Sequence, residues 1–480
     1  MGYFGIDFGT TNTSAVEVDG RAVQRYGDEQ GKPLPSVIIL NKATDRVIGG
    51  REAWNRRMEL QQVGGFEIVG SIKQCLESDR HWVTTGRTWT PCDIAAEVLK
   101  QLSDRARKYG VASGIQKATF SIPVGLSANA RGVLRDAAAL AGIEVSSFVA
   151  ESTAAFIRYF TDLRHCRHVA IFDWGGGTLD ISVLRVDGST IYELAKDGMT
   201  DAGDVMDQEL GLLVHRMVMA GRSANLGPEE VPTKDRDQLL IRSEMAKCQL
   251  SMDETVPVAL ERYAGSPASI VLSRKDAAVV LMPFVDRAIE LLASTVASAK
   301  LSVDALDDIV VIGGSSQLWL LDERLGADPR FSGRYRLASR PEWDVAQGAA
   351  ILEQTPGNYE LAETLGVQLC DGTHFELVRR GDPLETRVRT LSLALVEDTT
   401  EANVIIDRWA ESGSAVTNAL QFSVQTLGFL NDEIRLNYQL TRDLAFKVTA
   451  ESASRGPALA ETRQFSNLRF GYHMGEGNAR

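Results

Sequence analysis

Two glycine-rich stretches in this chain have the residue types and spacing that bind phosphate groups. The first reads Gly-Ile-Asp-Phe-Gly-Thr-Thr-Asn-Thr-Ser from Gly5 to Ser14. The second reads Phe-Asp-Trp-Gly-Gly-Gly-Thr-Leu-Asp-Ile-Ser-Val from Phe172 to Val183. In both, an apolar run ends at an Asp, passes through Gly and Thr residues, and resumes as a strand-like run. The two stretches therefore indicate an internal repeat of domain size.

The composition of these stretches suggests how they work. Glycine lets backbone N–H groups approach phosphate oxygens because no Cβ stands in the way, and the hydroxyl of Thr10 or Thr178 adds a donor. The carboxylate of Asp7 or Asp173 repels a phosphate, but it can hold a hydrated Mg²⁺ that contacts one. A single Gly-rich loop is as often an ordinary turn. A matched pair predicts a site that grips a polyphosphate from two sides.

Composition limits the class of protein. The chain has 480 residues, of which 44% are apolar and 24% charged, so we expect about three domain-sized units. A net charge of −13 argues against a general nucleic-acid or anionic-membrane binder. The five cysteines are scattered singly, which predicts reduced thiols and no zinc site. Without signal-peptide features or a long apolar run, the sequence favours a cytoplasmic protein with no membrane partner.

The elements that must position the glycine-rich stretches alternate between strand and helix patterns up to about residue 355. Thr90-Pro91-Cys92-Asp93 is a helix start with Thr as N-cap, and we expect this helix to run to about Tyr109. Asp308 to Ser316 is a buried strand running into glycines, a third candidate nucleotide contact. After Pro356-Gly357, short alternating runs predict a β-rich domain. The expected division is 1–355, a linker at 356–363, a β domain at 364–456 and a tail at 457–480.

Several charged positions have two readings from the residues alone. Lys73, taken by itself, reads as a solvated surface residue. Glu151 stands where a strand gives way to a helix, so it either compensates the helix dipole or belongs to a site. Glu244 and Lys247 lie three apart on a helix, which is typical of a surface ion pair.

With these segments placed, the chain resembles the DnaK-type, seventy-kilodalton heat-shock chaperones. Gly5 to Ser14 and Asp173 to Ser182 are similar to the two phosphate motifs of that family. Its connecting segment and its adenosine-side and closing motifs resemble 118–123, Arg131, 151–155, 308–316 and 341–350. The resemblance covers about residues 2 to 354. Over the C-terminal domain it rests on strand pattern and position.

The resemblance implies an α/β, actin-like ATPase domain with duplicated lobes around a nucleotide cleft, followed by a small β-rich domain. It implies an ATP-binding and slowly ATP-hydrolysing molecular chaperone, with ATP or ADP, Mg²⁺ and K⁺ as cofactors. The β domain would bind unfolded or extended peptide segments, or a specific protein client, according to nucleotide state. A co-chaperone and a nucleotide-exchange factor are the further partners it implies.

Site residues follow from the resemblance position by position. Asp7, Asp173 and Asp180 would organise the metal ions through water. Lys73 would position the attacking water, Glu151 would order metal-bound water, and Thr178 would donate to the γ-phosphate. Pro123 and Arg131 are similar to the family's interdomain switch pair. The implied nucleotide-binding positions are Gly9, Thr10, Thr11, Asn12, Gly175, Gly176, Gly177, Thr178, Gly203, Asp204, Glu244, Lys247, Ser251, Gly313, Gly314, Ser315, Gln317 and Glu342.

The chain also departs from the family pattern. Cys248 and Gln317 stand where the family commonly has two arginines that sandwich the adenine. Each lost stack costs about 0.5–2 kcal/mol, so we expect weaker ATP binding or looser base selectivity. Ala202 replaces a family Gly at the ribose-side turn, and the segment from Pro356 to Glu363 is polar where the family linker is leucine-rich. We expect no helical lid after the β domain, so a bound segment would exchange quickly.

Three other functions fit the same fold. A nucleotide-switched scaffold or filament of the bacterial actin type would not need the segment from Glu151 to Ala155 or an appended β domain. A small-molecule kinase would need a carboxylate base in a sugar-sized pocket, and no stretch of the chain suggests one. A divergent ATPase that only senses nucleotide accords with the changes at Cys248 and Gln317.

Overall fold

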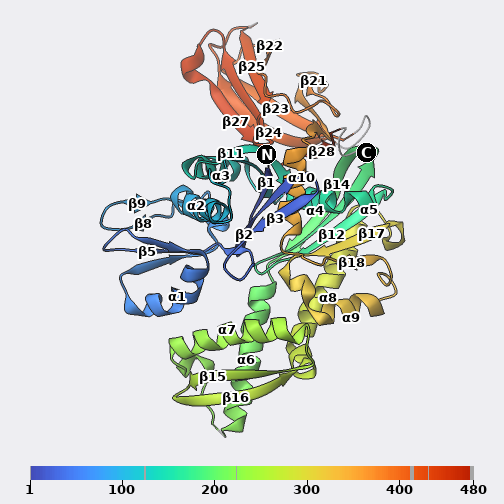
Figure 1. Cartoon of the computed structure of the whole chain (residues 1–480). Coiled ribbons are helices and arrows are strands. Elements are labelled where there is room, and N and C mark those ends of the chain that lie inside the picture. The colour runs from blue at the N-terminus through green and yellow to red at the C-terminus, as the bar shows by residue number, and fades with distance from the viewer. Residues whose placement is uncertain (1, 124–125, 223, 411–415, 431, 476–480) are drawn as a thin grey trace. The chain divides into compact units, whose positions relative to one another are not determined.

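The computed structural model describes residues 2–123, 126–222, 224–410, 416–430 and 432–475 (Figure 1). Contacts divide the chain into two compact units. Unit 1 comprises Met1–Pro123, Val133–Val186 and Leu194–Gln354. Unit 2 comprises Val124–Gly132, Asp187–Glu193 and Thr355–Arg480. Among the described helices, none is long and apolar enough to cross a membrane.

One strand arrangement occurs twice in unit 1. β1 (Tyr3–Phe8) pairs antiparallel with β2 (Asn12–Asp19) and parallel with β10 (Lys117–Ile122). β12 (His168–Trp174) pairs antiparallel with β13 (Leu179–Asp187) and parallel with β17 (Asp308–Ile312). Each glycine-rich stretch is the turn of an antiparallel hairpin whose first strand ends near its Asp. The repeat predicted from the two motifs is therefore a repeat of strand pairing.

The remaining strands of unit 1 extend these two centres or form small separate sheets. The first sheet has the order β11-β10-β1-β2-β3 with β4 on β2, and the second has β18-β17-β12-β13-β14. These strands are β3 (Ala22–Tyr26), β4 (Leu34–Pro35), β11 (Glu144–Ala150), β14 (Thr190–Met199) and β18 (Tyr335–Leu337). The small sheets are formed by β5 (Ile38–Asn41), β6 (Val47–Gly49) and β7 (Phe66–Val69), by β8 (Trp82–Val83) and β9 (Thr88–Trp89), and by β15 (Thr255–Tyr263) and β16 (Ser266–Ser273).

The helices cover these sheets. They are α1 (Gly50–Val63), α2 (Pro91–Lys108), α3 (Ala128–Leu140), α4 (Glu151–Arg158), α5 (Phe160–Leu163), α6 (Gly203–Gly221), α7 (Thr233–Leu250), α8 (Arg274–Ser298), α9 (Trp319–Ala327) and α10 (Asp344–Gln354). Short 3-10 segments lie at Ile72–Cys75, Pro228–Glu230, Val303–Ala305, Gly314–Gln317 and Pro457–Leu459. α2 begins as predicted: the Thr90 hydroxyl accepts from Asp93 N–H at 3.2 Å, and the Asp93 carboxylate accepts from Thr90 N–H at 2.9 Å.

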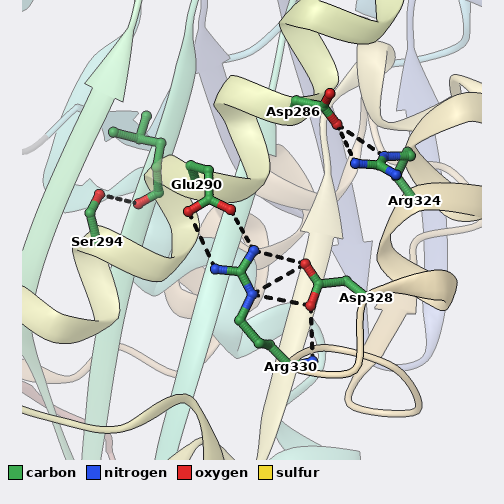
Figure 2. Close-up of polar contacts among 7 residues, drawn as sticks. Asp286, Glu290, Ser294, Arg324, Asp328 and Arg330 are labelled. Carbon is green, nitrogen blue, oxygen red and sulfur yellow. Dashed lines mark hydrogen bonds and ion pairs between the residues drawn. The ribbon is translucent and has the colours of Figure 1, made fainter.

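Ion pairs tie α8 to α9 and to the loop after it (Figure 2). Arg324 Nη2 lies 2.7 Å from Asp286 Oδ1. Arg330 bridges Glu290 on α8, at 2.5 Å, and Asp328 in its own loop, at 2.8 Å. The pairs with Asp286 and Glu290 are solvent-exposed, and each contributes at most about 1 kcal/mol. The buried apolar side chains beneath, such as Phe331 and Leu321, contribute most of the packing energy.

Unit 2 contains two antiparallel four-stranded sheets. One has the order β21-β20-β23-β24 and the other β22-β25-β26-β27. Alternate residues of β25, such as Leu436 and Leu440, are buried in a shared core with Ile406 and Val424 of the first sheet. The strands are β20 (Thr364–Gln368), β21 (His374–Val378), β22 (Arg389–Ala394), β23 (Glu401–Trp409), β24 (Thr417–Gln425), β25 (Glu433–Leu440), β26 (Phe446–Ser452) and β27 (Glu461–Phe465).

The two segments that were expected to be a linker and a tail both contain strands. The expected linker at 356–363 contains β19 (Asn358–Leu361), and the expected tail at 457–480 contains β27 and β28 (Phe470–His473). Both β19 and β28 span four residues, too few for an alternating pattern to identify them. Their backbone groups are satisfied by pairing with strands distant in sequence. The end of that expected tail, residues 476–480, lies outside the described residues.

α10 packs its own backbone against neighbouring elements. A Cβ added to Gly348 would lie 1.7 Å from the carbonyl oxygen of Ala154 on α4. A Cβ added to Gly5 on β1 would lie 2.2 Å from the carbonyl oxygen of Ala346. Backbone atoms cannot move aside as a flexible side chain can. The glycines therefore set how closely α10 approaches the strand that carries Asp7.

Gly348→Ala should lower the free energy of unfolding by about 1–3 kcal/mol, because the added methyl group forces α10 away from α4. The matched control is Gly221→Ala at the end of α6, where an added Cβ meets nothing within 4 Å. That change should be neutral or stabilising by up to about 1 kcal/mol, since Ala favours helix over Gly. Midpoints of urea unfolding measure both. Equal midpoints for the two variants would contradict this account of the packing.

A buried ion pair joins α6 to α7. Lys247 Nζ lies 2.9 Å from Asp207 Oδ1 and donates to the carbonyl oxygen of Gly203 at 2.9 Å. Burial raises the pKa of Asp207 to about 7, although the Lys247 ammonium opposes the shift. The folded protein thus holds this proton more tightly than the unfolded chain, whose Asp titrates near 3.8. The contribution of Asp207 to stability therefore falls as the pH rises through this window.

From about pH 5.5 to about pH 8, the wild type should lose about 1–2 kcal/mol more of its unfolding free energy than Asp207→Asn, which cannot titrate. Urea midpoints across this range measure the difference. Asp201→Asn, which removes an exposed carboxylate paired with Arg287, is the control and should follow the wild type. Parallel curves for wild type and Asp207→Asn would show that Asp207 does not titrate in this range.

Candidate functional site

The two glycine-rich hairpins of unit 1 approach each other closely. A Cβ added to Gly176 would lie 3.2 Å from Thr11 Oγ1, and one added to Gly177 would lie 3.4 Å from the same atom. A Cβ on Gly9 would lie 2.1 Å from the carbonyl oxygen of Asn12, so the first turn admits only glycine there. Thr10 and Thr11 therefore lie directly against the glycine backbone of the second hairpin.

The start of α6 and the glycines after β17 join the second hairpin. Asp204 N–H donates to the carbonyl oxygen of Gly176 at 2.7 Å, and Gly203 N–H donates to that of Gly175 at 3.3 Å. Ser315 Oγ donates to the Gly175 carbonyl at 2.8 Å. These contacts bring together three segments that the sequence separated by up to 140 residues.

The turn after β17 needs glycine for two reasons. Gly313 has φ +84°, which disfavours other residues. A Cβ at this position would also lie 2.5 Å from Asp173 Oδ1. The third predicted nucleotide contact thus lies directly against the carboxylate of the second hairpin.

Lys73 and Glu151 form a buried ion pair. Lys73 Nζ lies 2.7 Å from Glu151 Oε1, and the side chains are only 8% and 18% exposed. Lys73 comes from the short 3-10 segment after β7, and Glu151 is the first residue of α4. Burial lowers the pKa of Lys73, but Glu151 and Asp7 outweigh it and raise the pKa above its ordinary value. The reading of Lys73 as a solvated surface residue is therefore wrong.

Carboxylates outnumber ammonium groups at this point. Asp7 accepts from the hydroxyl of Ser121 at 2.8 Å, and burial with the charge of Glu151 raises its pKa to about 6. Burial, followed by Glu151, Asp7 and Asp180, raises the pKa of Asp173 well above its ordinary value, while Lys73 lowers it. A cation would relieve this repulsion.

This donor set fits a hydrated Mg²⁺. Oxygen donors from Asp7, Asp173 and Asp180 are the ligands this ion prefers, and Mg²⁺ usually keeps several of its waters. Across the described part of the chain, no three His, Cys, Asp or Glu side chains are grouped closely enough to hold a metal.

The hydroxyl of Thr178 already has a partner. It donates to Asp180 Oδ2 at 2.8 Å, at the exposed end of the second hairpin. To donate to a phosphate, as the resemblance implies, this hydroxyl has to rotate away from Asp180. A hydroxyl turns about one bond, so the change needs no movement of the backbone.

The residues expected beside the nucleoside have several other contacts. Lys247 is held by Asp207 and Gly203, as described above. Gln317 donates its amide to the carbonyl oxygen of Ala338 at 3.1 Å. Glu244 and Ser251 on and after α7 are half-buried, Glu342 in the turn before α10 is exposed, and Gly314 opens the 3-10 segment after Gly313.

Two residues of this region were not predicted from the sequence. Ser121 faces Asp7 because β1 and β10 pair in parallel with these residues in register. Arg57 of α1 lies near Glu244 and Asp204, whose charges oppose the lowering of its pKa by burial. The serine could have been found by assuming that pairing. An arginine in a polar helix carries no such signal.

The expected switch pair falls at the edge of the two units. Pro123 ends the first segment of unit 1, directly after β10. Arg131 belongs to unit 2 and is 3% exposed. Its guanidinium donates to the carbonyl oxygens of Leu126, at 2.7 and 3.0 Å, and of Leu444, at 3.2 Å, and also to that of Asp443. The contacts recorded for Arg131 thus lie within unit 2.

Comparison with known proteins agrees with this arrangement of motifs. A family model described as "Hsp70 protein" matches residues 66–357. The chain is also 26% identical over 454 residues to "Chaperone protein DnaK" of Prochlorococcus marinus (strain MIT 9515). That match covers 86% of this chain and 66% of the relative, so the chain spans slightly less than two thirds of that protein. Because the family model matches more than half of its residues, the chain belongs to the Hsp70 protein family.

Proposed function

We propose that this protein is an ATP-hydrolysing molecular chaperone of the Hsp70 type, in which unit 1 is an actin-like nucleotide-binding domain. The observation that carries the proposal is the buried Lys73–Glu151 pair placed among the carboxylates of two glycine-rich hairpins. The strand pairing repeated around β1 and β12 supports the duplicated, actin-like reading. Family membership makes ATP the nucleotide to test first.

The proposed chemistry is positioning combined with electrostatic stabilisation. The backbone N–H groups and hydroxyls of the hairpins bind the phosphates of ATP. Asp7, Asp173 and Asp180 would hold a hydrated Mg²⁺, which would neutralise phosphate charge, and K⁺ is the further cation that the resemblance implies. The Lys73 ammonium, kept protonated and oriented by Glu151, holds the attacking water and the γ-phosphate. Hydrolysis by a water molecule that Lys73 holds needs no covalent intermediate with the protein.

Lys73→Ala should reduce single-turnover ATP hydrolysis by at least about 100-fold, because the charge facing the γ-phosphate is lost. ADP affinity measured by calorimetry should change by less than about 10-fold if the fold is kept. The matched control is Lys100→Ala on α2, which removes a half-exposed lysine paired with Glu97. Hydrolysis by Lys73→Ala at the wild-type rate would refute the role given to this lysine.

The nucleoside side is proposed to bind adenine less strongly than the family pattern implies. Cys248 is exposed, and Gln317 is tethered to Ala338. Neither side chain supplies the planar cation that stacks on a base. Lys247 is tied to Asp207 and shapes the turn at Gly203. Affinity here would come chiefly from the phosphates, with Glu244, Ser251 and Glu342 at the ribose and base side.

Unit 2 is proposed to bind extended peptide segments or a protein client. Exposed apolar side chains gather at two loops, with Val396 in one and Leu427, Phe429 and Leu430 in the other. The loops are joined by hydrogen bonds from Thr426 N–H to the carbonyl oxygen of Thr400, at 2.9 Å, and from Leu430 N–H to Asp398 Oδ1, at 2.7 Å. Two loops that are hydrogen-bonded to each other and expose apolar side chains are suited to bind an extended apolar segment.

Fluorescence anisotropy of labelled, extended apolar peptides tests this part of the proposal. Peptide should bind the full-length protein without nucleotide and be released by Mg-ATP, because nucleotide shifts a population only through different affinities of two states. Lys73→Ala should still release peptide, since release follows ATP binding. If no peptide binds in either state, the chaperone activity is contradicted. Pelleting with ATP would then test a nucleotide-switched filament or scaffold.

A further inference from the structure

Ser121 lies opposite Asp7 in the first sheet of unit 1. β1 and β10 pair in parallel, and their register sets Asp7 against Ser121. Side chains of a strand alternate between its two faces, so residues in register on neighbouring strands share a face. Ser121 is fully buried, and its hydroxyl donates to Asp7 Oδ1 at 2.8 Å. The carboxylate of Asp7 is therefore held by a side chain from the neighbouring strand.

The same strand also borders the segment that leads to Glu151. On its other edge, β10 pairs in parallel with β11, whose last residue, Ala150, directly precedes Glu151. Asp7 and the start of α4 thus lie on the two sides of β10. A hydroxyl on β10 is well placed to fix the carboxylate of Asp7 relative to the Lys73–Glu151 pair.

The second half of the repeat has a different residue at the equivalent position. β12 and β17 pair in parallel as β1 and β10 do, but the residue in register with Asp173 is Ile312. The isoleucine side chain has no polar hydrogen to donate. Asp180 does receive a hydroxyl, from Thr178 at 2.8 Å. The two halves therefore differ at the carboxylate that ends each first strand, although their strand pairing is the same.

A hydrogen bond to one oxygen determines how a carboxylate meets a cation. The group has two oxygens, and a donor at Oδ1 restricts its rotation, so that Oδ2 keeps a defined direction. Mg²⁺ demands near-ideal octahedral geometry and usually keeps several of its waters. A carboxylate that is oriented before binding loses less freedom when it accepts hydrogen bonds from those waters.

We propose that Ser121 is a positioning residue of the proposed nucleotide site, whose hydroxyl orients the carboxylate of Asp7 toward a hydrated Mg²⁺. The inference rests on the proposed function and deepens it. Ser121 would contact neither the nucleotide nor the metal. Removal of such a supporting partner typically lowers metal affinity by about 10- to 100-fold. The role of Ser121 should therefore appear in the Mg²⁺ dependence of nucleotide binding.

Calorimetric titration of the full-length protein with ADP, at a series of Mg²⁺ concentrations, tests this role. In the wild type, ADP affinity should rise with Mg²⁺ to a plateau. Ser121→Ala should need at least about 5-fold more Mg²⁺ to reach half of that rise, because Asp7 loses its orienting donor. Its ADP affinity in EDTA should stay within about 2-fold of the wild-type value, since Ser121 does not touch the nucleotide.

Three further variants separate the hydroxyl from the packing. Ser121→Thr keeps a hydroxyl in a strand, where β-branched residues are favoured, and its Mg²⁺ requirement should stay within about 2-fold of wild type. Ser103→Ala on α2 makes the same change at another buried serine, whose hydroxyl accepts from Ile115 N–H at 3.0 Å, and should leave the Mg²⁺ requirement unchanged. If urea unfolding shows that Ser121→Ala does not fold, Ser121→Cys replaces it. The thiol is a weak donor, so the Mg²⁺ requirement should again rise.

The outcomes distinguish the positioning role from the proposed function. A wild-type Mg²⁺ requirement in folded Ser121→Ala or Ser121→Cys overturns the role. An equal rise in Ser121→Thr and Ser121→Ala also overturns it, because the hydroxyl would not be the cause. ADP binding by the wild type that does not depend on Mg²⁺ overturns the role but leaves nucleotide binding standing. If the wild type binds neither ADP nor ATP, the proposed function is overturned together with the role.

Discussion

The repulsion among partly buried carboxylates around one lysine is the constraint on which the rest of unit 1 depends. Asp7 and Asp173 lie next to the ends of the first strands of two hairpins, and Glu151 begins α4. Each carboxylate loses hydration on burial, and the ammonium of Lys73 is an opposite charge close to all three. Such an arrangement costs stability in the free protein. The carboxylates stay together because the hydrogen-bonded strands that carry Asp7 and Asp173 fix the positions of their backbones.

Close approach of backbone to backbone makes this possible. Gly348 lets α10 touch α4, Gly5 lets it touch β1, and Gly203 and Gly313 let two turns close on the second hairpin. The glycines at the hairpins and those under α10 have the same physical purpose, since in each a side chain would occupy space that another segment needs. Close packing of other segments against glycine backbone thus forms both the site and the packing that supports it.

The residues expected beside a nucleoside are organised differently, because several of their side chains bond within the protein itself. Lys247 compensates Asp207 and fixes Gly203, while the amide of Gln317 bonds to Ala338. A side chain that is already bonded within the protein can orient a turn, but it adds little to the binding free energy of a ligand. In the function proposed above, recognition of the nucleotide therefore depends mainly on its phosphates.

Local sequence patterns were enough to predict the two hairpins, their repeat, the capped helix from Pro91 and the β-rich character of the chain after Pro356, because each is encoded within a few neighbouring residues. It could not decide between the readings of Lys73 or of Glu151. That choice depends on which segments meet, and Lys73 and Glu151 meet although they follow strands of two different sheets, β7 and β11. The same holds for Ser121 beside Asp7. Only the tertiary structure placed β19 and β28 in a sheet, since their pairing partners are distant in sequence and the runs are too short to carry a pattern of their own.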